Sequence, residues 1–170
     1  MAEPEQWVIA YWLVPAAPFR EFFAEIIARL AARYDAPIFN PHLTVAVGPD
    51  SALASERALA GLTTTALELQ ASGIDFSAKF TRSLFVRFQP SPALRQLRAS
   101  LGGKEDGGFD PHVSLLYQRL PEEEQARLAS ELQLPFAAVR FDAVAAIRCR
   151  IPVETAADVA VWKNVASAKL

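Results

Sequence analysis

The chain has 170 residues, of which 52% are hydrophobic, so it can bury a sizeable core, and we expect residues 1–170 to form one domain. The formal net charge is −2 and no block of five or six like charges occurs, which argues against a protein that holds long nucleic acid on a broad basic surface. Cys149 is the only cysteine, which excludes an internal disulfide and a four-cysteine metal site.

The apolar stretch near the N-terminus, residues 7–14, is too short to cross a membrane or to serve as a convincing signal peptide. A single cysteine is most simply explained in a reducing compartment. We therefore expect a cytoplasmic protein, a monomer, without a membrane partner.

In the first half of the chain, the continuous apolar run 7–14 is rich in β-branched and aromatic residues and predicts a buried strand. From Phe19 to Leu30 the apolar residues recur at the i, i+3, i+4, i+7 spacing of one helix face. The later elements predicted for this half are a strand over 41–46, a shorter helix over 53–62, and two strand pieces or one bent strand over 67–80.

The same order of elements returns in the second half. Ser91 and Pro92 are typical of the N-cap and first position of a helix, which should stop at the glycines 102–103. The other elements predicted here are strands over 83–88 and 111–117, a helix opening at Pro121, and closing strands over 136–141, 144–151 and 159–165.

The two halves, approximately 7–80 and 81–165, thus run strand, helix, strand, helix, strand twice over. Each half is too small to be well stabilised alone, so the two should share a core. We predict an α+β fold of two pseudo-symmetric halves, bilobal, with a mostly antiparallel sheet, helices outside and a central cleft.

The chain's only two histidines lie in similar hexamers, 70 positions apart. Both hexamers read proline, histidine, an apolar residue, a hydroxyl residue and two more apolar residues. In a strand whose side chains alternate between two faces, His42 and Thr44 share one face, as do His112 and Ser114. The repetition predicts a paired site.

Two imidazoles can perform displacement at phosphorus when one accepts a proton from water and the other donates a proton to the leaving oxygen. The hydroxyls of Thr44 and Ser114 would hold phosphate oxygens beside the rings. Such a site needs neither a metal nor a cofactor, and a zinc site is disfavoured because there is no third histidine. The alternative, two structural histidines that cap strands through hydrogen bonds, leaves the duplicated motif unexplained.

With one such motif in each half, the chain resembles the two-histidine phosphoesterase superfamily over roughly residues 7–165. This superfamily includes RNA 2′,3′-cyclic phosphodiesterases, once called 2′-5′ RNA ligases, and the smaller cyclic phosphodiesterases. The stretch 111–117, preceded by the strand at 82–87, is more similar to the cyclic phosphodiesterase branch.

The resemblance implies that both motifs face a central cleft and that the protein hydrolyses a 2′,3′-cyclic or 1″,2″-cyclic phosphate without metal. His42 and His112 would be the acid and base, and Thr44 and Ser114 the phosphate-binding residues. It also implies that Tyr117 lies at the active site. Strict alternation puts Tyr117 on the face opposite His112, so this role requires a bend or bulge at the strand end.

We therefore expect an enzyme, a cyclic phosphodiesterase that acts on a small cyclic-phosphate nucleotide or sugar. Within the same class, the alternative is an enzyme acting on RNA ends, although the absence of a basic stripe speaks against it. From another class, the alternative is a module that binds a nucleotide without turnover. Arg82, Arg87 and Arg148 could each meet a phosphate, and the sequence does not choose among them.

Overall fold

The computed structural model describes residues 4–170 and contains seven strands, five α-helices and one 3₁₀ helix in this part of the chain. Their order and bounds are β1 (Gln6–Pro15), α1 (Phe19–Tyr34), β2 (Leu43–Pro49), α2 (Ala52–Ala60), β3 (Leu67–Phe76), the 3₁₀ helix η1 (Phe80–Arg82), β4 (Leu84–Phe88), α3 (Pro92–Ser100), β5 (His112–Leu116), α4 (Glu122–Glu131), β6 (Ala138–Ile151), α5 (Ala156–Ala160) and β7 (Lys163–Lys169). The predicted α+β class is confirmed.

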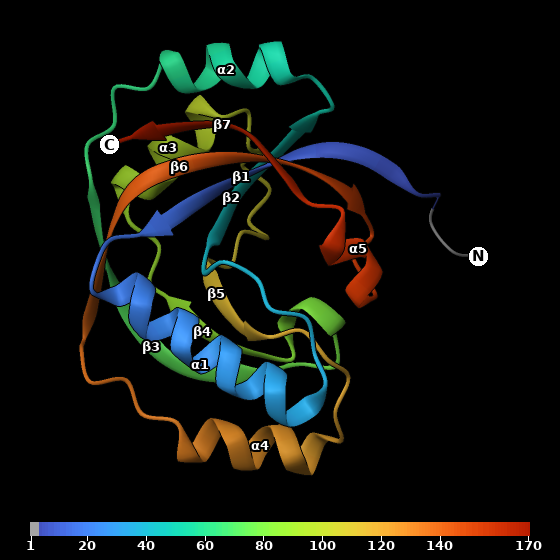
Figure 1. Ribbon diagram of the computed structural model, residues 1–170. Coiled ribbons are helices and arrows are strands. Elements are labelled where there is room, and N and C mark those ends of the chain that lie inside the picture. Colours follow the sequence, from blue (N-terminus) through green and yellow to red (C-terminus); the bar gives the residue numbers. More distant parts are fainter. Residues whose placement is uncertain (1–3) are drawn as a thin grey trace.

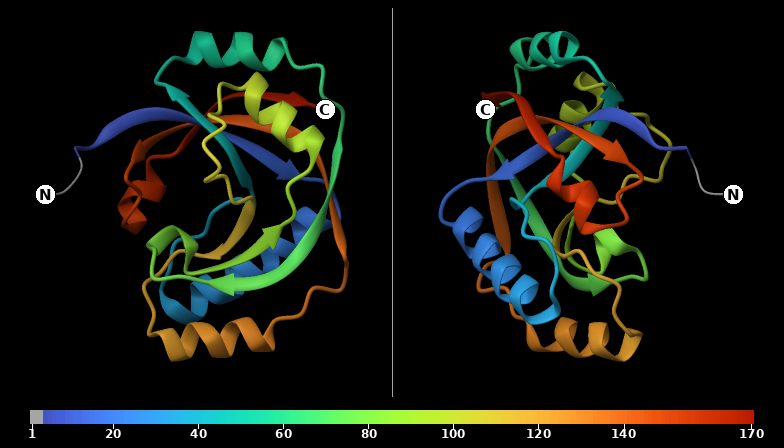
Figure 2. Two further views of the ribbon diagram at one scale, coloured as in Figure 1. Left: turned by 180° about the vertical axis from the view of Figure 1, so that it is seen from behind. Right: turned by 45° about the vertical axis from the view of Figure 1, so that its right-hand side comes forward.

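The strands form a sheet in the order β2-β1-β6-β3-β4-β5, with β7 beside β6, and all neighbours are antiparallel. If β1 is exchanged with β4, β2 with β5 and β3 with β6, the order reads the same in reverse. The helices follow this symmetry: α1 contacts β5, α3 contacts β2, and α2 and α4 lie at opposite ends of the molecule (Figure 1, Figure 2). The internal repeat of the sequence therefore corresponds to an approximate twofold relation in space.

The two repeats exchange strands. The last strand of the first repeat, β3, pairs with β4, and the last strand of the second repeat, β6, pairs with β1 along most of its length. The boundary near residue 80 thus separates the repeats along the chain but not in the sheet. Strand β2 begins directly after His42, and β5 begins with His112. The exchange places these two strands at the two ends of the strand order.

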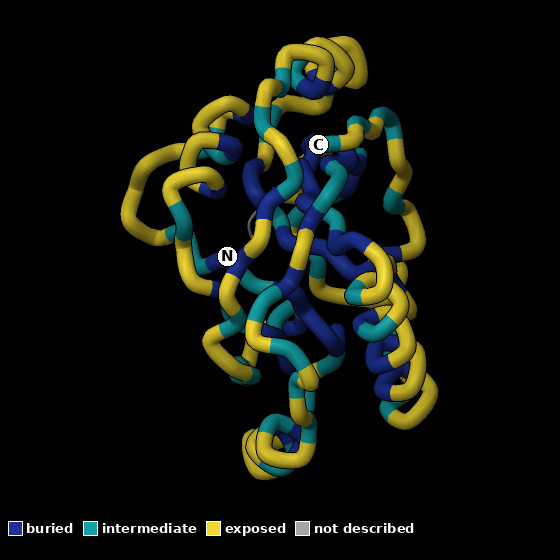
Figure 3. The backbone as a smooth tube through the Cα atoms, turned by 90° about the vertical axis from the view of Figure 1, so that its left-hand side faces the viewer, coloured by how far each residue is buried: buried dark blue, intermediate teal, exposed yellow. Residues whose placement is uncertain are grey.

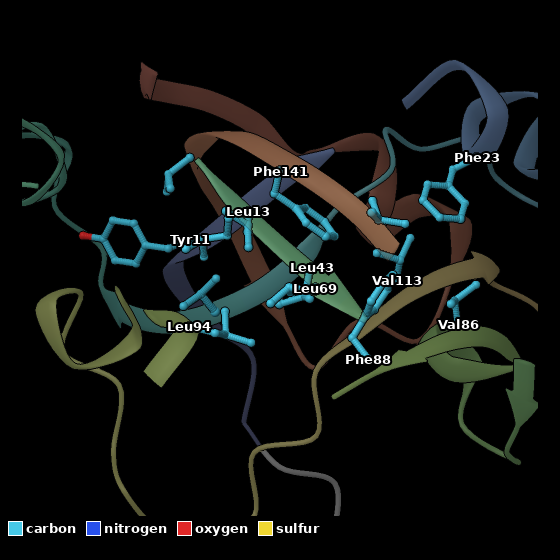
Figure 4. Close-up of a cluster of buried hydrophobic side chains, with 14 of the residues drawn as sticks. Tyr11, Leu13, Phe23, Leu43, Leu69, Val86, Phe88, Leu94, Val113 and Phe141 are labelled. Carbon is cyan, nitrogen blue, oxygen red and sulfur yellow. The ribbon is translucent and has the colours of Figure 1, made fainter. Parts of the chain in front are cut away.

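One buried cluster contains side chains of both repeats, as predicted from their small size. Figure 4 shows part of this cluster, including Leu13, Phe23 and Leu43 from the first repeat and Val86, Phe88, Leu94 and Val113 from the second. Figure 3 shows where the buried residues lie: exposed segments predominate in the helices at the two ends of the molecule, and buried segments in the strands between them.

The prediction of three closing strands is wrong. Residues 138–151 form one strand, and Asp142 between the first two predicted strands is the extra residue where the pairing of β6 with β1 shifts between Val14 and Pro15. Residues 159–165 are not one strand either. Thr155 and Asp158 form a capping box that starts the short helix α5, and β7 begins only at Lys163.

For residues 67–80 the sequence left open two strand pieces or one bent strand, and the structure shows one strand, β3, over Leu67–Phe76. It is a single strand with an irregular register between Ala71 and Gly73, and Gly73 has a φ of 119°, which only glycine adopts readily. Its first part pairs with β6 and its second part with β4. No helix among residues 4–170 has both the length and the apolar character that crossing a bilayer would require.

Candidate active site

All five residues that the sequence singled out line one cleft of about 310 Å³. These residues are His42, Thr44, His112, Ser114 and Tyr117. Ala10 and Trp12 of β1 and Cys149 and Ile151 of β6 also line it, and these four side chains lie in a small apolar cluster separate from the main core. The cleft therefore lies on the face of β1 and β6 opposite the main core.

Each histidine is held by the carbonyl group two residues before it. His42 Nδ1 lies 2.7 Å from the oxygen of Asn40, and His112 Nδ1 lies 2.8 Å from the oxygen of Asp110. Because a carbonyl only accepts hydrogen bonds, Nδ1 carries the proton in both neutral rings, and Nε2 holds the free lone pair. The proline between the two residues restricts the backbone and brings no competing N–H group, which explains its place in both motifs.

A bulge at the same position of both repeats decides where Tyr117 lies. Trp12 pairs with Thr44 and Tyr11 with Ala46, so one residue of β2 has no partner on β1. In the same way, one residue of β5 directly after Ser114 has no partner on β4. The extra residue reverses the alternation beyond it. Tyr117 therefore lines the cleft together with His112, as its expected role requires.

His42 lies in an aromatic enclosure. Its ring stacks on Trp12 with the centroids 3.6 Å apart, and the rings of Phe39 and Trp162 approach it edge-on. The hydroxyl oxygen of Tyr117 lies 3.5 Å from His42 Nε2, a long contact. Only 6% of His42 is exposed, and this burial, together with the charge of His112, lowers the pKa of His42 to about 4.

His112 lies in more polar surroundings. The carboxylate of Asp110 accepts hydrogen bonds from Arg82 at 2.6 Å and from Arg87 at 3.1 Å, and both guanidinium groups lie over the ring of Phe85, which approaches His112 edge-on. Burial lowers the pKa of His112; the two arginines lower it further, whereas the hydrogen bond to the Asp110 carbonyl and the Asp110 charge oppose this. The half-buried ring is the more accessible of the two.

The two hydroxyl groups of the motifs are not equivalent. Ser114 Oγ donates to the carbonyl oxygen of Thr81 at 2.6 Å, so its proton is already used. Thr44 makes no side-chain hydrogen bond within residues 4–170. In this state Thr44 has its hydroxyl proton available for a ligand, whereas Ser114 would have to rotate.

The structure distinguishes the three arginines. Arg82 lines the cleft, and its buried Nε has no partner among the described residues, whereas Arg87 bridges Asp75 and Asp110. Arg148 pairs with Asp50 and does not line the cleft. The segment that carries Arg82 is held in place from α4, because Gln125 donates to the carbonyl oxygens of residues 77 and 83.

Lys79 and Trp162 are among the cleft-lining residues that sequence reasoning missed. Neither belongs to a repeated motif, so no pattern indicated them. No carboxylate lines the cleft, and in residues 4–170 no three His, Cys, Asp or Glu side chains gather closely enough to hold a metal ion.

Comparison with solved structures shows which fold this is. The crystal structure of Escherichia coli LigT in its apo form superposes with a TM-score of 0.58 at 16% identity, covering 99% of both chains. The chain has the LigT fold. LigT with 3′-AMP gives a TM-score of 0.55 at 19% identity over 99% of both chains, and a phosphoesterase gives 0.56 at 18% identity over 97% of this chain and 99% of that one.

The comparison confirms the expected α+β architecture as the LigT fold. Neither a family model nor a curated protein sequence matches the chain. At below 20% identity to its structural neighbours, the chain's activity has to be argued from its own cleft.

Proposed function

We propose that the protein is a phosphoesterase of the two-histidine type that hydrolyses a cyclic phosphodiester to a phosphomonoester without a metal ion. The observation that carries this proposal is the pair of histidines at equivalent positions of two repeats, both with a free Nε2 and both lining one cleft. Lys79 and Arg82 supply positive charge in the same cleft, which suits an anionic substrate.

The different surroundings of the histidines suggest their roles. Two imidazolium ions in one cleft repel each other, so a single proton goes to the ring that is less costly to charge. His42 is the more deeply buried, and its pKa of about 4 keeps it neutral. We therefore assign His42 as the general base and His112, in its protonated form, as the general acid.

In the proposed reaction, His42 Nε2 takes a proton from a water molecule as the water oxygen bonds to phosphorus. The bond between phosphorus and one ring oxygen of the cyclic ester breaks, and that oxygen receives the proton of His112 Nε2. Negative charge on the non-bridging oxygens is stabilised by Arg82, Lys79 and the hydroxyl of Thr44.

Tyr117 would orient the attacking water. Burial raises the pKa of its hydroxyl far above the usual range, so the group stays protonated and donates a hydrogen bond. Its contact with His42 Nε2 is long, which leaves room for a small rearrangement when water and substrate enter. Crystal structures of LigT contain phosphate, 3′-AMP, ATP or NADP⁺, all of which carry phosphate, and this is consistent with phosphate-ester binding by the fold.

The test is hydrolysis of a panel of 2′,3′-cyclic mononucleotides in excess EDTA, with the double variant His42→Ala/His112→Ala as the control. Turnover by the wild type and not by the double variant would support metal-free chemistry at this pair, and the isomer released would show which bond breaks. Turnover lost in EDTA and restored by a metal would overturn the metal-free mechanism. Nucleotide binding without product would favour a binding module instead.

A further inference from the structure

Helix α4 buries a polar side chain at a position where a core-facing helix normally carries an apolar one. Its buried residues are Gln125 and Leu128, and 3% of Gln125 is exposed. A buried amide adds little net stability compared with an apolar side chain of similar size, and it is costly when it lacks partners. The partners of Gln125 therefore indicate what this side chain does.

The amide of Gln125 joins the two ends of one connection. Helix α4 contacts β3 and β4, and these strands are joined by residues 77–83, which contain η1. Gln125 Nε2 lies 2.7 Å from the carbonyl oxygen of Ser77, and 3.1 Å and 2.9 Å from the carbonyl oxygen and Oγ of Ser83. Since an amide nitrogen only donates, one side chain of α4 holds the first and last residues of the connection.

The connection that Gln125 holds carries three side chains of the cleft. Lys79, Thr81 and Arg82 all line it. Within the connection, Ser77 Oγ donates to the carbonyl oxygen of Arg82 at 2.7 Å, so the end that Gln125 contacts is also bonded to the residue with the guanidinium group. The path from α4 to the cleft thus consists of two consecutive hydrogen bonds.

Arg82 keeps donors available for an anion. Its Nη2 donates to the carboxylate of Asp110 at 2.6 Å, and its guanidinium group lies over the ring of Phe85, whereas its buried Nε has no partner among the described residues. A planar guanidinium group binds a phosphate well only in the right orientation. A displacement of about 1 Å can lower a rate by roughly 10²-fold, so the backbone that carries Arg82 has to be fixed.

The equivalent position of the first repeat has no such reach. Ser55, 70 positions before Gln125, lies on α2 and is also buried, but its Oγ donates to the carbonyl oxygen of Ala52 in the same helix. The two repeats thus share a buried polar position. The long amide occurs on the side of the fold where a connection brings cations into the cleft.

We propose that Gln125 is a positioning residue of the cleft, which fixes the connection 77–83 so that its cations face the substrate phosphate. Gln125 does not touch the substrate and acts through Arg82. This proposal deepens the proposed function and rests on it, because it uses the histidine cleft as the place of the phosphate.

Kinetics of single and double variants would separate positioning from a general structural role. Gln125→Met keeps the length of the side chain and removes its donors, so we expect kcat for a 2′,3′-cyclic nucleotide to fall by about tenfold. In an Arg82→Ala background the same substitution should lower kcat by less than about twofold, since the group that it misplaces is absent. The same factor in both backgrounds, or no loss of kcat in the single variant, would overturn the proposal.

A variant on the same face of α4 controls for a loss of stability. Leu128→Val shortens the other buried side chain of the helix, which has no hydrogen bond to the connection, so it should lower the melting temperature and leave kcat unchanged. Thermal denaturation of both variants would show that each is folded at the assay temperature. Equal losses of kcat in Leu128→Val and Gln125→Met would refute the positioning role.

Ser77→Ala tests the same path if Gln125→Met does not fold. It removes the hydrogen bond to the carbonyl oxygen of Arg82 from a half-buried position. A loss of kcat that disappears in the Arg82→Ala background supports the path from α4 to the cleft. An unchanged kcat in Ser77→Ala overturns it.

Binding of inorganic phosphate gives a readout that does not depend on turnover. If no cyclic ester is hydrolysed, the proposed function is rejected, and calorimetry with inorganic phosphate then tests the positioning by itself. Affinity about tenfold weaker in Gln125→Met than in the wild type and in Leu128→Val supports the role of Gln125, because a misplaced guanidinium group loses charge-assisted hydrogen bonds to the anion. Equal affinities of the three proteins reject it.

Discussion

The surroundings of His42 and His112 differ more than their backbones do. Each lies beside a segment that follows an exchanged strand: η1 follows β3 and contacts β5, and α5 follows β6. The segment with η1 brings Lys79 and Arg82 into the cleft, whereas the segment with α5 brings Val153 and Trp162. Equivalent positions in the two repeats thus contribute cations on one side and apolar groups on the other.

The two strands that carry the motifs show the same divergence. Five residues after each histidine stand Val47 and Tyr117, and the bulges bring both to the cleft. An approximately twofold fold can therefore hold two histidines in different surroundings, as the proposed base and acid roles require, because the pKa of a histidine depends on burial and neighbouring charge rather than on its backbone position.

Removal of either imidazole should have the largest effect. We expect His42→Ala and His112→Ala each to lower kcat for a cyclic nucleotide by roughly 10²- to 10⁴-fold, because each ring moves a proton in the transition state. If the two rings act as a pair, kcat of the double variant will be only slightly lower than that of the less active single variant. Steady-state kinetics with circular dichroism as a folding control would measure this, and near-normal turnover in either variant would exclude the mechanism.

Arg82→Ala should have the next largest effect. Loss of its charge should reduce kcat by about 10²-fold, since a preorganised cation stabilises charge that develops in the transition state. Arg82→Lys should recover part of the loss. Arg148→Ala, which removes an arginine paired with Asp50 outside the cleft, is the matched control and should leave kcat unchanged. Equal kcat values for Arg82→Ala and the wild type would mean that η1 has no part in catalysis.

The burial of His42 should appear as a dependence of stability on pH. The pKa of His42 is about 4 in the folded chain and about 6.5 when the chain is unfolded, so below pH 6.5 only the unfolded state takes up the proton. The free energy of unfolding should therefore fall as the pH falls from 6.5 towards 4, by about 2 kcal/mol at pH 5 from this residue.

Urea denaturation at pH 7 and pH 5 would measure this loss. Most of this loss in the free energy of unfolding should disappear in His42→Asn. A smaller part of it should disappear in His112→Asn, because the ring removed there is more accessible. An unchanged pH dependence in His42→Asn would show that the aromatic enclosure does not exclude the charged ring.

The smallest effects concern the two hydroxyl groups. Ser114→Ala removes a hydrogen bond to Thr81 and should lower the free energy of unfolding by about 1 kcal/mol, in addition to any loss of activity. Thr44→Ala should reduce activity by about tenfold with little effect on stability, because its hydroxyl makes no hydrogen bond within residues 4–170 and is proposed to bind the substrate. Thermal denaturation combined with kinetics separates the two, and equal stability losses in both variants would contradict the assigned difference.

Much of the element order could be predicted because it depends on local periodicity. The helix face from Phe19 to Leu30, the N-cap at Ser91 and the apolar run of β1 are each visible within a few residues, and all appear in the structure. The error at residues 159–165 has a local origin too, since the capping box of Thr155 and Asp158 precedes an apolar run that resembles a strand.

Some residues of the candidate site could likewise be predicted from the sequence, and others could not. His42, Thr44, His112 and Ser114 could be named from the sequence because a duplicated pattern distinguishes them from ordinary core residues. Trp162, Lys79 and the choice of Arg82 could not, since these residues occur once and reach the cleft only through the pairing of distant strands.

The sequence by itself determined the α+β class, the repeated order of elements and the paired motif, because each depends on residues close together along the chain. Tertiary structure alone decided that β3 and β6 exchange between the repeats, that a bulge turns Tyr117 into the cleft, and that Lys79 and Arg82 reach the cleft beside the two histidines. These features arise from strand register and from contacts between segments many residues apart, which local side-chain patterns do not specify.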